Sequence, residues 1–378
     1  MASPKACVQC GKCLEVCPLF KATGREELTP RAKFFLQSLD PAQGLSVNDF
    51  NSLASLCLSC GRCAKNCPQN MSGPELVSEL RAGSNGFLRT CWDIWLASPG
   101  VLWPTAAALS RFSPESLPEP FGSAKKRMAS LFAKSPAPWA EVLPQVCFEE
   151  RKAVLFKGCV GRYARKDWAS KAEHLMDAAG LVRPGEINFS CCGSSYGSAG
   201  LLDRQRDARK KNIRVWQDAG EPLLVTFCAT CLKGLKEYDV EDFSGSEELR
   251  SRWMESLTPL SSLLAGAEIT LLDNCPDQVI YHKPCHAAQP DADLEFVQAV
   301  AGDRLLPVKD DLCCGFGGVM QIGAPKLSRQ VGEHCMTSLT EGADAGAQIV
   351  SGCSACVIQL ATLAKDAYFA THWLDILK

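Results

Sequence analysis

Two stretches of the sequence share one spacing of cysteines: CVQCGKCLEVCP at residues 7–18 and CLSCGRCAKNCP at residues 57–68. In each stretch, three cysteines are separated by two residues, a fourth follows after three more, and a proline comes next. Three thiols in one tight loop can occupy three corners of a compact metal centre, whereas the fourth ligand has to arrive from a separate turn of the chain. The spacing therefore predicts two metal centres near the start of the chain.

This spacing is typical of domains that hold two [4Fe–4S] clusters, where the fourth cysteine of each run ligates the cluster of the other run. The predicted ligands are Cys7, Cys10, Cys13 and Cys67 for cluster 1, and Cys57, Cys60, Cys63 and Cys17 for cluster 2. Two structural zinc sites are the alternative, because four thiolates also satisfy Zn²⁺. Zinc sites usually show two separated C-x2-C pairs, whereas a triple followed by a fourth cysteine and a proline occurs here twice. The pattern favours clusters.

The composition limits the class of protein. The chain has 378 residues, 46% of them hydrophobic, and a net charge of −2, so it can bury several cores and has no global field that favours nucleic acid. Its 22 cysteines would indicate a disulfide framework only in a small secreted domain. No apolar signal core precedes Cys7, and Asp93, Pro99 and Pro104 interrupt the most apolar stretch, residues 92–112. That stretch either packs on the first domain or docks a partner or a membrane surface. We expect a cytoplasmic protein with at most peripheral contact at the inner face of the membrane, through partners.

Shifts in composition divide the chain into four predicted regions. Residues 1–85 are cysteine-dense at both ends and helix-like between them, with Pro30 in the first turn of a helix. Residues 86–148 form a proline-rich helical connector. Residues 149–262 and 263–378 alternate strand-like runs with amphipathic helices, which is the pattern of α/β domains. The predicted fold class is α+β multidomain: a helical two-cluster domain followed by a pseudo-duplicated α/β cysteine-rich region.

The last two regions repeat one cysteine pattern. In each, one cysteine follows a strand-like run, an adjacent pair precedes a glycine, and a C-x2-C comes last. The two sets are Cys159, Cys191, Cys192, Cys228 and Cys231 in the first half, and Cys285, Cys313, Cys314, Cys353 and Cys356 in the second half. Sites in open α/β sheets lie at the carboxyl ends of strands, so the three loops of one half can meet at one site. Five thiols exceed the four that a structural zinc ion needs, which favours a larger metal assembly or a redox site.

The arrangement resembles a known family of iron–sulfur oxidoreductase subunits. The C…CCG…C-x2-C pattern is similar to that of the cysteine-rich (CCG) family, with members in glycolate and lactate oxidases, anaerobic glycerol-3-phosphate dehydrogenase and heterodisulfide reductase. The long helical interval between the two cluster motifs resembles the helical ferredoxin domains of succinate dehydrogenase iron–sulfur subunits and of heterodisulfide reductase. The segment Thr29-Pro30-Arg31-Ala32 resembles the family's Pro-Arg-Gly segment, from which Ala32 departs.

In heterodisulfide reductase, the cysteines that match both halves hold noncubane [4Fe–4S] clusters that cleave a disulfide. The resemblance therefore implies one or two further iron–sulfur clusters here, with the cluster type of each half left open. His282 and His286 flank Cys285, and we interpret them as supporting or packing residues, because five thiols are already available.

Several other residues near or outside the motifs receive a simpler interpretation. Those beside the cluster motifs are interpreted mainly as solvated side chains, with tuning of the clusters as the alternative: Lys12, Arg62 and Lys65. The cysteines outside every motif are interpreted as core-packing residues: Cys91, Cys147, Cys275 and Cys335. No catalytic residue is assigned.

No dinucleotide- or phosphate-cradling motif occurs in the sequence, so we expect no intrinsic flavin. The chain is interpreted as the electron-transfer subunit of a multi-subunit oxidoreductase. An FAD- or FMN-containing dehydrogenase partner would oxidise a 2-hydroxy acid (glycolate or lactate) or glycerol-3-phosphate, and electrons would pass through this chain toward a quinone or another carrier. A further electron-transfer or membrane subunit is an additional expected partner. The alternative is that the cysteine-rich region is itself catalytic and reduces a disulfide, as in heterodisulfide reductase.

Overall fold

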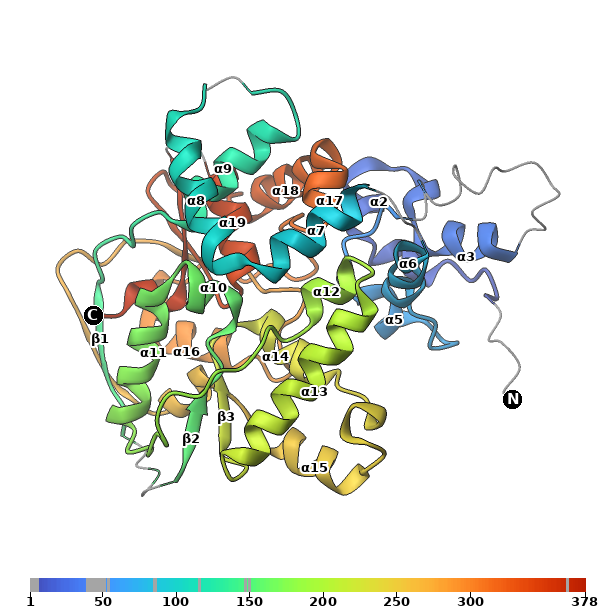
Figure 1. Cartoon of the computed structure of the whole chain (residues 1–378). Helices are drawn as coiled ribbons and strands as arrows, with labels where there is room; N and C mark the ends of the chain where they lie inside the picture. Colours follow the sequence, from blue (N-terminus) through green and yellow to red (C-terminus); the bar gives the residue numbers. More distant parts are fainter. Residues whose placement is uncertain are drawn as a thin grey trace.

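The computed structural model of the chain describes residues 7–38, 52, 55–83, 87–114, 117–145, 148, 151–364 and 367–378 (Figure 1). The amino-terminal part lies at one side of a larger body formed by the two cysteine-rich halves, and the connector helices lie over one end of that body (Figure 1). Contacts between all three parts decide which cysteine loops face one another.

Short helices carry the cysteine loops of the amino-terminal part. They are α1 (Lys12–Glu15), α2 (Pro18–Thr23), α3 (Pro30–Ser38), α5 (Arg62–Asn66) and α6 (Gly73–Ala82), with the 3₁₀ helix η1 (Glu26–Leu28) between α2 and α3. Pro18 and Pro30 begin α2 and α3, at a position where a missing N–H has no helical partner to lose. Gly11 and Gly61 precede α1 and α5 with φ of 81° and 76°, a conformation that glycine adopts without strain. The glycine of each cysteine run therefore lets the loop turn into a helix.

The connector is helical and ends in a strand. It comprises α7 (Phe87–Ala97), α8 (Pro99–Phe112), α9 (Phe121–Leu131) and β1 (Ala140–Leu143). The proline-rich composition did not predict β1, which pairs antiparallel with β5 (Glu268–Leu271). Among the residues that the structure describes, no helix combines the length and the apolar character needed to cross a bilayer.

Part of the apolar stretch at 92–112 is buried in the fold. Trp103 of α8 stacks on Trp95 of α7, with 6.1 Å between ring centroids, and meets Tyr163 of the first half edge-on. Val101 and Phe112 on the same helix point to solvent and are 70% and 89% exposed. The stretch therefore anchors the connector through its tryptophans and leaves other apolar side chains uncovered.

Each cysteine-rich half contains a three-stranded parallel sheet. In the first half the order is β2 (Ala153–Leu155), β3 (Leu223–Thr226) and β4 (Leu257–Pro259). In the second half the order is β6 (Val279–Tyr281), β7 (Gln348–Ser351) and β8 (Phe369–His372). The first two strands of each sheet are buried along their whole length, as expected for parallel strands covered on both faces. The matching order confirms the predicted duplication.

Helices connect these strands. The first half contains α10 (Gly158–Tyr163), α11 (Lys166–Ala178), α12 (Ser194–Ser198), α13 (Leu202–Asp218), α14 (Ala229–Lys236) and α15 (Glu247–Ser256), with the 3₁₀ helices η3 (Val240–Phe243) and η4 (Leu260–Leu264). The second half contains α16 (Ala292–Ala301), α17 (Met320–Gly323), α18 (Pro325–Leu339) and α19 (Ser354–Leu363), with η5 (Gly302–Arg304) and η6 (Trp373–Ile376). Cys228 and Cys353 are the N-cap residues of α14 and α19. Each C-x2-C therefore lies at the carboxyl end of the middle strand of its sheet.

Reciprocal contacts join the two halves. η4, which follows the last strand of the first half, packs on α16 of the second half, and η6, which follows the last strand of the second half, packs on α11. Asp375 of η6 is 1% exposed and accepts hydrogen bonds from Arg165 Nη2 and Trp168 Nε1, each at 2.7 Å. In the other direction, Ser261 Oγ of η4 donates to Asp293 of α16 at 2.6 Å. These buried polar contacts fix the two sheets relative to each other.

The amino-terminal part docks where the two halves meet. Arg81 Nη1 of α6 donates to the Ser198 carbonyl of α12, and Arg62 Nη2 of α5 donates to the Leu312 carbonyl of the second half, each at 2.5 Å. An apolar cluster continues the contact with the second half and consists mainly of Leu19, Leu28, Leu58, Met320 and Val331.

Two glycines permit this close docking. Gly200 and Gly317 have φ of +73° and +58°. A Cβ at Gly200 would lie 2.5 Å from the Ala82 nitrogen, and one at Gly317 would lie 2.6 Å from Leu58 Cδ2. Any side chain at these positions would push the amino-terminal part away from the cysteine-rich halves.

We expect Asp375→Ala to destabilise the chain by about 3–5 kcal/mol, because it leaves the buried Arg165 charge without this partner. Thermal unfolding followed by circular dichroism measures the change as a lower melting temperature. Asp167→Ala is the matched control: Asp167 binds the same guanidinium at 2.8 Å, but its side chain is 43% exposed. The control should cost no more than about 1 kcal/mol. Equal shifts for the two variants would contradict the role assigned to the contact between the halves.

Candidate metal centres

A cavity at the exposed end of the amino-terminal part, here named the outer cavity, gathers the four cysteines predicted for cluster 1. They are Cys7, Cys10, Cys13 and Cys67. Cys10 is exposed, so this site lies near solvent. Arg31 lines the same cavity, and its Nε donates to Glu26 at 3.0 Å. The charge of the outer cavity's arginine is therefore paired with a carboxylate.

A second cavity, the inner cavity, gathers the four cysteines predicted for cluster 2. They are Cys17, Cys57, Cys60 and Cys63, and the side chain of Lys33 lines the cavity with them. Burial raises the pKa of Cys63 to about 12 and also raises the pKa values of Cys17 and Cys60. Thiols in this setting ionise only when a cation compensates their charge, which a metal centre would do.

The inner cavity lies against the second cysteine-rich half. Cys60 is close enough to Cys313 for the charges of the two thiols to interact. The charge of Cys60 also acts on Cys285. His286 of the second half contacts the amino-terminal part and the first half. Its Nε2 lies 3.4 Å from the Ser59 carbonyl, and its Nδ1 lies 3.0 Å from Thr230 Oγ1. A carbonyl can only accept, so the Nε2–H donates to Ser59.

The thiols of the second half form a continuous series. Cys285 is within hydrogen-bonding reach of Cys313, which meets the adjacent Cys314. Cys356 is within hydrogen-bonding reach of both Cys314 and Cys353. The structure thus brings together all five cysteines that the sequence pattern placed in this half.

The first half repeats this series and joins it. Cys353 is within hydrogen-bonding reach of Cys228, so the C-x2-C segments of the two halves touch. From Cys228 the contacts continue through Cys231, Cys192 and Cys191 and end at Cys159. The repeat pattern predicted two separate sites, and the contact between them is a finding of the tertiary structure.

The donor sets fit a sulfur-rich metal assembly. Their members are buried or half-buried thiols, apart from the exposed Cys10, and thiolates select zinc or iron–sulfur clusters over hard cations. Gly193 and Gly315 follow the adjacent pairs with φ of +93° and +80°, the turn predicted for them. Among the described residues, no group of His, Cys, Asp or Glu side chains is arranged to hold a single metal ion.

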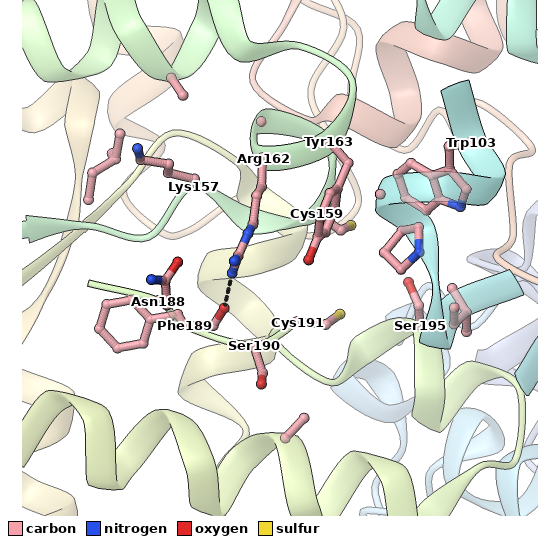
Figure 2. Close-up of a pocket in the computed structure, with 18 of the residues that line it drawn as sticks. Trp103, Lys157, Cys159, Arg162, Tyr163, Asn188, Phe189, Ser190, Cys191 and Ser195 are labelled. Carbon is pink, nitrogen blue, oxygen red and sulfur yellow. Dashed lines mark hydrogen bonds between the residues drawn. The ribbon is translucent and has the colours of Figure 1, made fainter. Parts of the chain in front are cut away.

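The series ends at a large open cavity, here named the terminal cavity, with a volume of about 850 Å³. Cys159 and Cys191 lie next to each other in its lining, with Trp103 and Ser195 at one side (Figure 2). Arg162 reaches across the cavity, and its Nη1 donates to the Phe189 carbonyl at 3.0 Å (Figure 2). Cationic side chains on the walls outnumber carboxylates: Lys157, Arg162, Lys166, Arg204 and Lys211 against Glu173, Glu186 and Asp207. A small molecule can therefore approach the last thiols of the series.

The structure corrects two of the simpler sequence interpretations. Arg62 is buried, with 9% exposure, and is not the solvated side chain that was expected, whereas Lys12 and Lys65 are exposed. Cys91 is exposed and does not pack in a core, although Cys335 does, with 0% exposure.

Other predicted residues lie as follows. Cys275 is partly buried against the core, and Cys147 lies outside the described residues. His282 is fully buried, with Nδ1 3.3 Å from Ser351 Oγ, and burial lowers the pKa values of His282 and His286 to about 4. Both histidines are therefore neutral at pH 7, which suits supporting residues.

Lys33 is the main residue that the sequence analysis missed. It lies on α3 with 2% exposure, and its Nζ donates to the Leu28 carbonyl. The available signal was weak: a single lysine in the helix between the two cluster motifs, among the apolar residues Ala32, Phe34 and Phe35.

Comparisons with known proteins agree with this architecture. The 4Fe-4S dicluster domain profile matches residues 3–71, and the cysteine-rich domain profile matches twice, at 153–236 and 279–361. The chain is 24% identical to the glycolate oxidase iron-sulfur subunit of Escherichia coli K12, over 99% of this chain and 93% of the relative. It is 25% identical to one of the subunits of the dihydromethanophenazine:CoB–CoM heterodisulfide reductase of Methanosarcina acetivorans, over 93% and 86%.

A probable glycolate oxidase iron-sulfur subunit of Bacillus subtilis is 22% identical over 94% of this chain and 87% of the relative. The resemblance inferred from the cysteine patterns is thereby confirmed. This chain belongs to the iron–sulfur oxidoreductase subunits that join a 4Fe-4S dicluster domain to two cysteine-rich domains.

Proposed function

We propose that this chain takes electrons from a flavoprotein partner that oxidises a 2-hydroxy acid, such as glycolate or lactate, or glycerol-3-phosphate, and passes them toward a quinone or another carrier. The observation that carries this proposal is the series of cysteines that runs from the outer cavity, through Cys63, which lines both the outer and the inner cavity, to the terminal cavity. Iron–sulfur clusters bound along it would supply one-electron transfer. The relatives from glycolate oxidases, which match almost the whole chain, support this choice.

The chain's own residues suit such a path. Its two ends are accessible, at the exposed Cys10 and at the open cavity beside Cys159, whereas the thiols between them are mostly buried. Burial excludes water from the middle of the path and lowers the local dielectric constant, so neighbouring charges act strongly there. An entry, a protected interior and an exit are what a transfer subunit requires.

The proposed ligands follow the cavities. Cluster 1 is assigned to Cys7, Cys10, Cys13 and Cys67 of the outer cavity. Cluster 2 is assigned to the four cysteines of the inner cavity, among them Cys63, which lines both cavities. The five thiols of each cysteine-rich half are assigned to a further cluster, because their crowding and burial call for a cationic centre. His286 and Thr230 are supporting residues, since Thr230 Oγ1 lies 3.2 Å from Cys353 Sγ.

A second candidate function is the reduction of a disulfide in the terminal cavity. The size of that cavity, its basic walls and the intact cysteine sets of both halves favour it, as does the heterodisulfide reductase relative. In that case the disulfide would take up two electrons and two protons and become two thiols. We prefer the first function because a chain of sites with two accessible ends serves transfer between two partners.

We expect Cys67→Ser to abolish the electron paramagnetic resonance signal of cluster 1 and to leave that of cluster 2, because Cys67 lies in the outer cavity with Cys7, Cys10 and Cys13. Iron analysis should show a loss of about four irons per chain. Cys17→Ser is the matched variant and should affect cluster 2 alone, since Cys17 lies in the inner cavity. If each replacement damaged the cluster nearest to it in sequence, the crossed assignment would be wrong.

The isolated chain, purified anaerobically, should contain no flavin and should not oxidise glycolate, lactate or glycerol-3-phosphate. Addition of the flavoprotein partner and its substrate should bleach the visible absorbance of the clusters. Oxidation of any of these substrates by the isolated chain would contradict the proposal. Rapid reduction of an added disulfide, with a reduced viologen dye as electron donor, would instead favour the second candidate function.

Cys192→Ala and Cys314→Ala, tested separately, should each remove a paramagnetic signal distinct from those of the two cubane clusters, and should slow electron transfer to the acceptor. Both thiols lie in the middle of the series of their half. Zinc has no redox role, so structural zinc sites would lose stability without losing any signal. Stoichiometric zinc and only two cubane signals in the metal-replete wild type would defeat this prediction.

A further inference from the structure

Lys33 is a buried cation that faces the inner cavity. Its ammonium group has the Leu28 carbonyl as its hydrogen-bond acceptor, and no carboxylate of the described residues forms an ion pair with it. The ionisable groups whose charges reach it most strongly are Cys57, Cys17 and Cys63. A lysine that is 2% exposed needs an anion beside it, and these cysteines are the only source of negative charge among its strongest neighbours.

Arg62 is a second buried cation near the same site. It interacts with the charges of Cys60 and of Cys313, between the inner cavity and the second half. Its nearest carboxylate is that of Asp311, at 3.8 Å, and the Asp311 side chain is 59% exposed to solvent. Much of the Arg62 charge is therefore directed at the thiols.

The outer cavity has a different electrostatic environment. The charge of Arg31 also interacts with Cys13 and Cys7, but Arg31 is paired with Glu26, and Lys12 is exposed, so a carboxylate and water weaken the effect of both charges. The two predicted clusters have the same ligand chemistry, four cysteine thiolates each. The two sites therefore differ in their cations: those at the inner site are buried and have no buried carboxylate partner, whereas those at the outer site are paired or exposed.

We propose that Lys33 is the counter-ion of cluster 2 and that, together with Arg62, it makes the inner site easier to reduce than the outer one. This rests on the proposed function, because it assumes that both cavities hold [4Fe–4S] clusters. Reduction adds one negative charge, and a buried cation stabilises that charge far more than a solvated cation does. Electrons that arrive at the exposed outer site then move downhill to the inner site, which contacts the second cysteine-rich half. The donor partner docks at the Cys10 side.

A redox titration of the full chain, followed by electron paramagnetic resonance, tests this proposal. The Cys67→Ser and Cys17→Ser variants assign the two signals. In the wild type, the midpoint potential of cluster 2 should be higher than that of cluster 1. Lys33→Met, which removes the charge and keeps an unbranched side chain, should lower the midpoint potential of cluster 2 and change that of cluster 1 less.

Two further variants separate charge from shape. Lys33→Arg keeps a positive charge and should leave cluster 2 closer to the wild-type potential than Lys33→Met does. Lys65→Met removes an exposed charge of α5 and should leave both potentials nearly unchanged. Loss of cluster 2 in Lys33→Met with its retention in Lys33→Arg would also support the counter-ion role.

Three results would overturn the proposal. They are a wild-type cluster 2 with a potential at or below that of cluster 1, an unchanged potential in Lys33→Met, and loss of cluster 2 in both Lys33 variants, which would show that the site needs the shape of lysine and not its charge. Iron analysis of the wild type distinguishes this failure from that of the proposed function. If both cubane clusters are present but their midpoint potentials are in the opposite order, only the electrostatic inference is refuted. If the clusters are absent, the proposed function is refuted as well.

Discussion

The burial of many thiols side by side is the constraint on which the rest of this structure depends. Burial and mutual repulsion oppose the ionisation of many of these thiols, as the raised pKa values of Cys17 and Cys63 show. Positive charge has to be supplied from a metal centre or from side chains. The fold provides for both, because it groups the thiols in sets of four or five and directs buried cations such as Lys33 and Arg62 at the inner site.

The thiol sets can touch only because the two cysteine-rich halves are held in one fixed orientation. The exchange of η4 and η6 between the halves does this, with Asp375 and Asp293 as its buried polar contacts. As a result, the ends of β3 and β7 face each other and Cys228 meets Cys353. Replacement of either carboxylate would therefore act on the spacing of the thiol sets as well as on stability. Gly200 and Gly317 allow the amino-terminal part to pack closely against the two halves, because a side chain at either position would clash with it.

The two ends of the series differ in their exposure and in the charges around them. One end is small, exposed and lined by a paired arginine, which suits contact with another protein surface. The other is a cavity of about 850 Å³ with an excess of basic side chains, which suits a small molecule or a narrow projection of a partner. Between them, the buried cations Lys33 and Arg62 lie near the thiols of the inner cavity. Under the proposed order of potentials, transfer from the outer to the inner site would be downhill.

The sequence by itself determined the ligand chemistry, the class of cofactor and the duplication of the cysteine-rich region, because these depend on spacings within short segments. Three cysteines in seven residues, or a C-x2-C after an apolar strand, define a local geometry wherever the segment lies. The boundaries drawn at residues 85, 148 and 262 stay predictions. Only the tertiary structure decided that Cys60 faces Cys313, that Cys228 meets Cys353, and that Lys33 and Arg62 are buried beside the inner site. These contacts join segments far apart in the chain or depend on which face of a short helix is covered, and no local periodicity encodes either property.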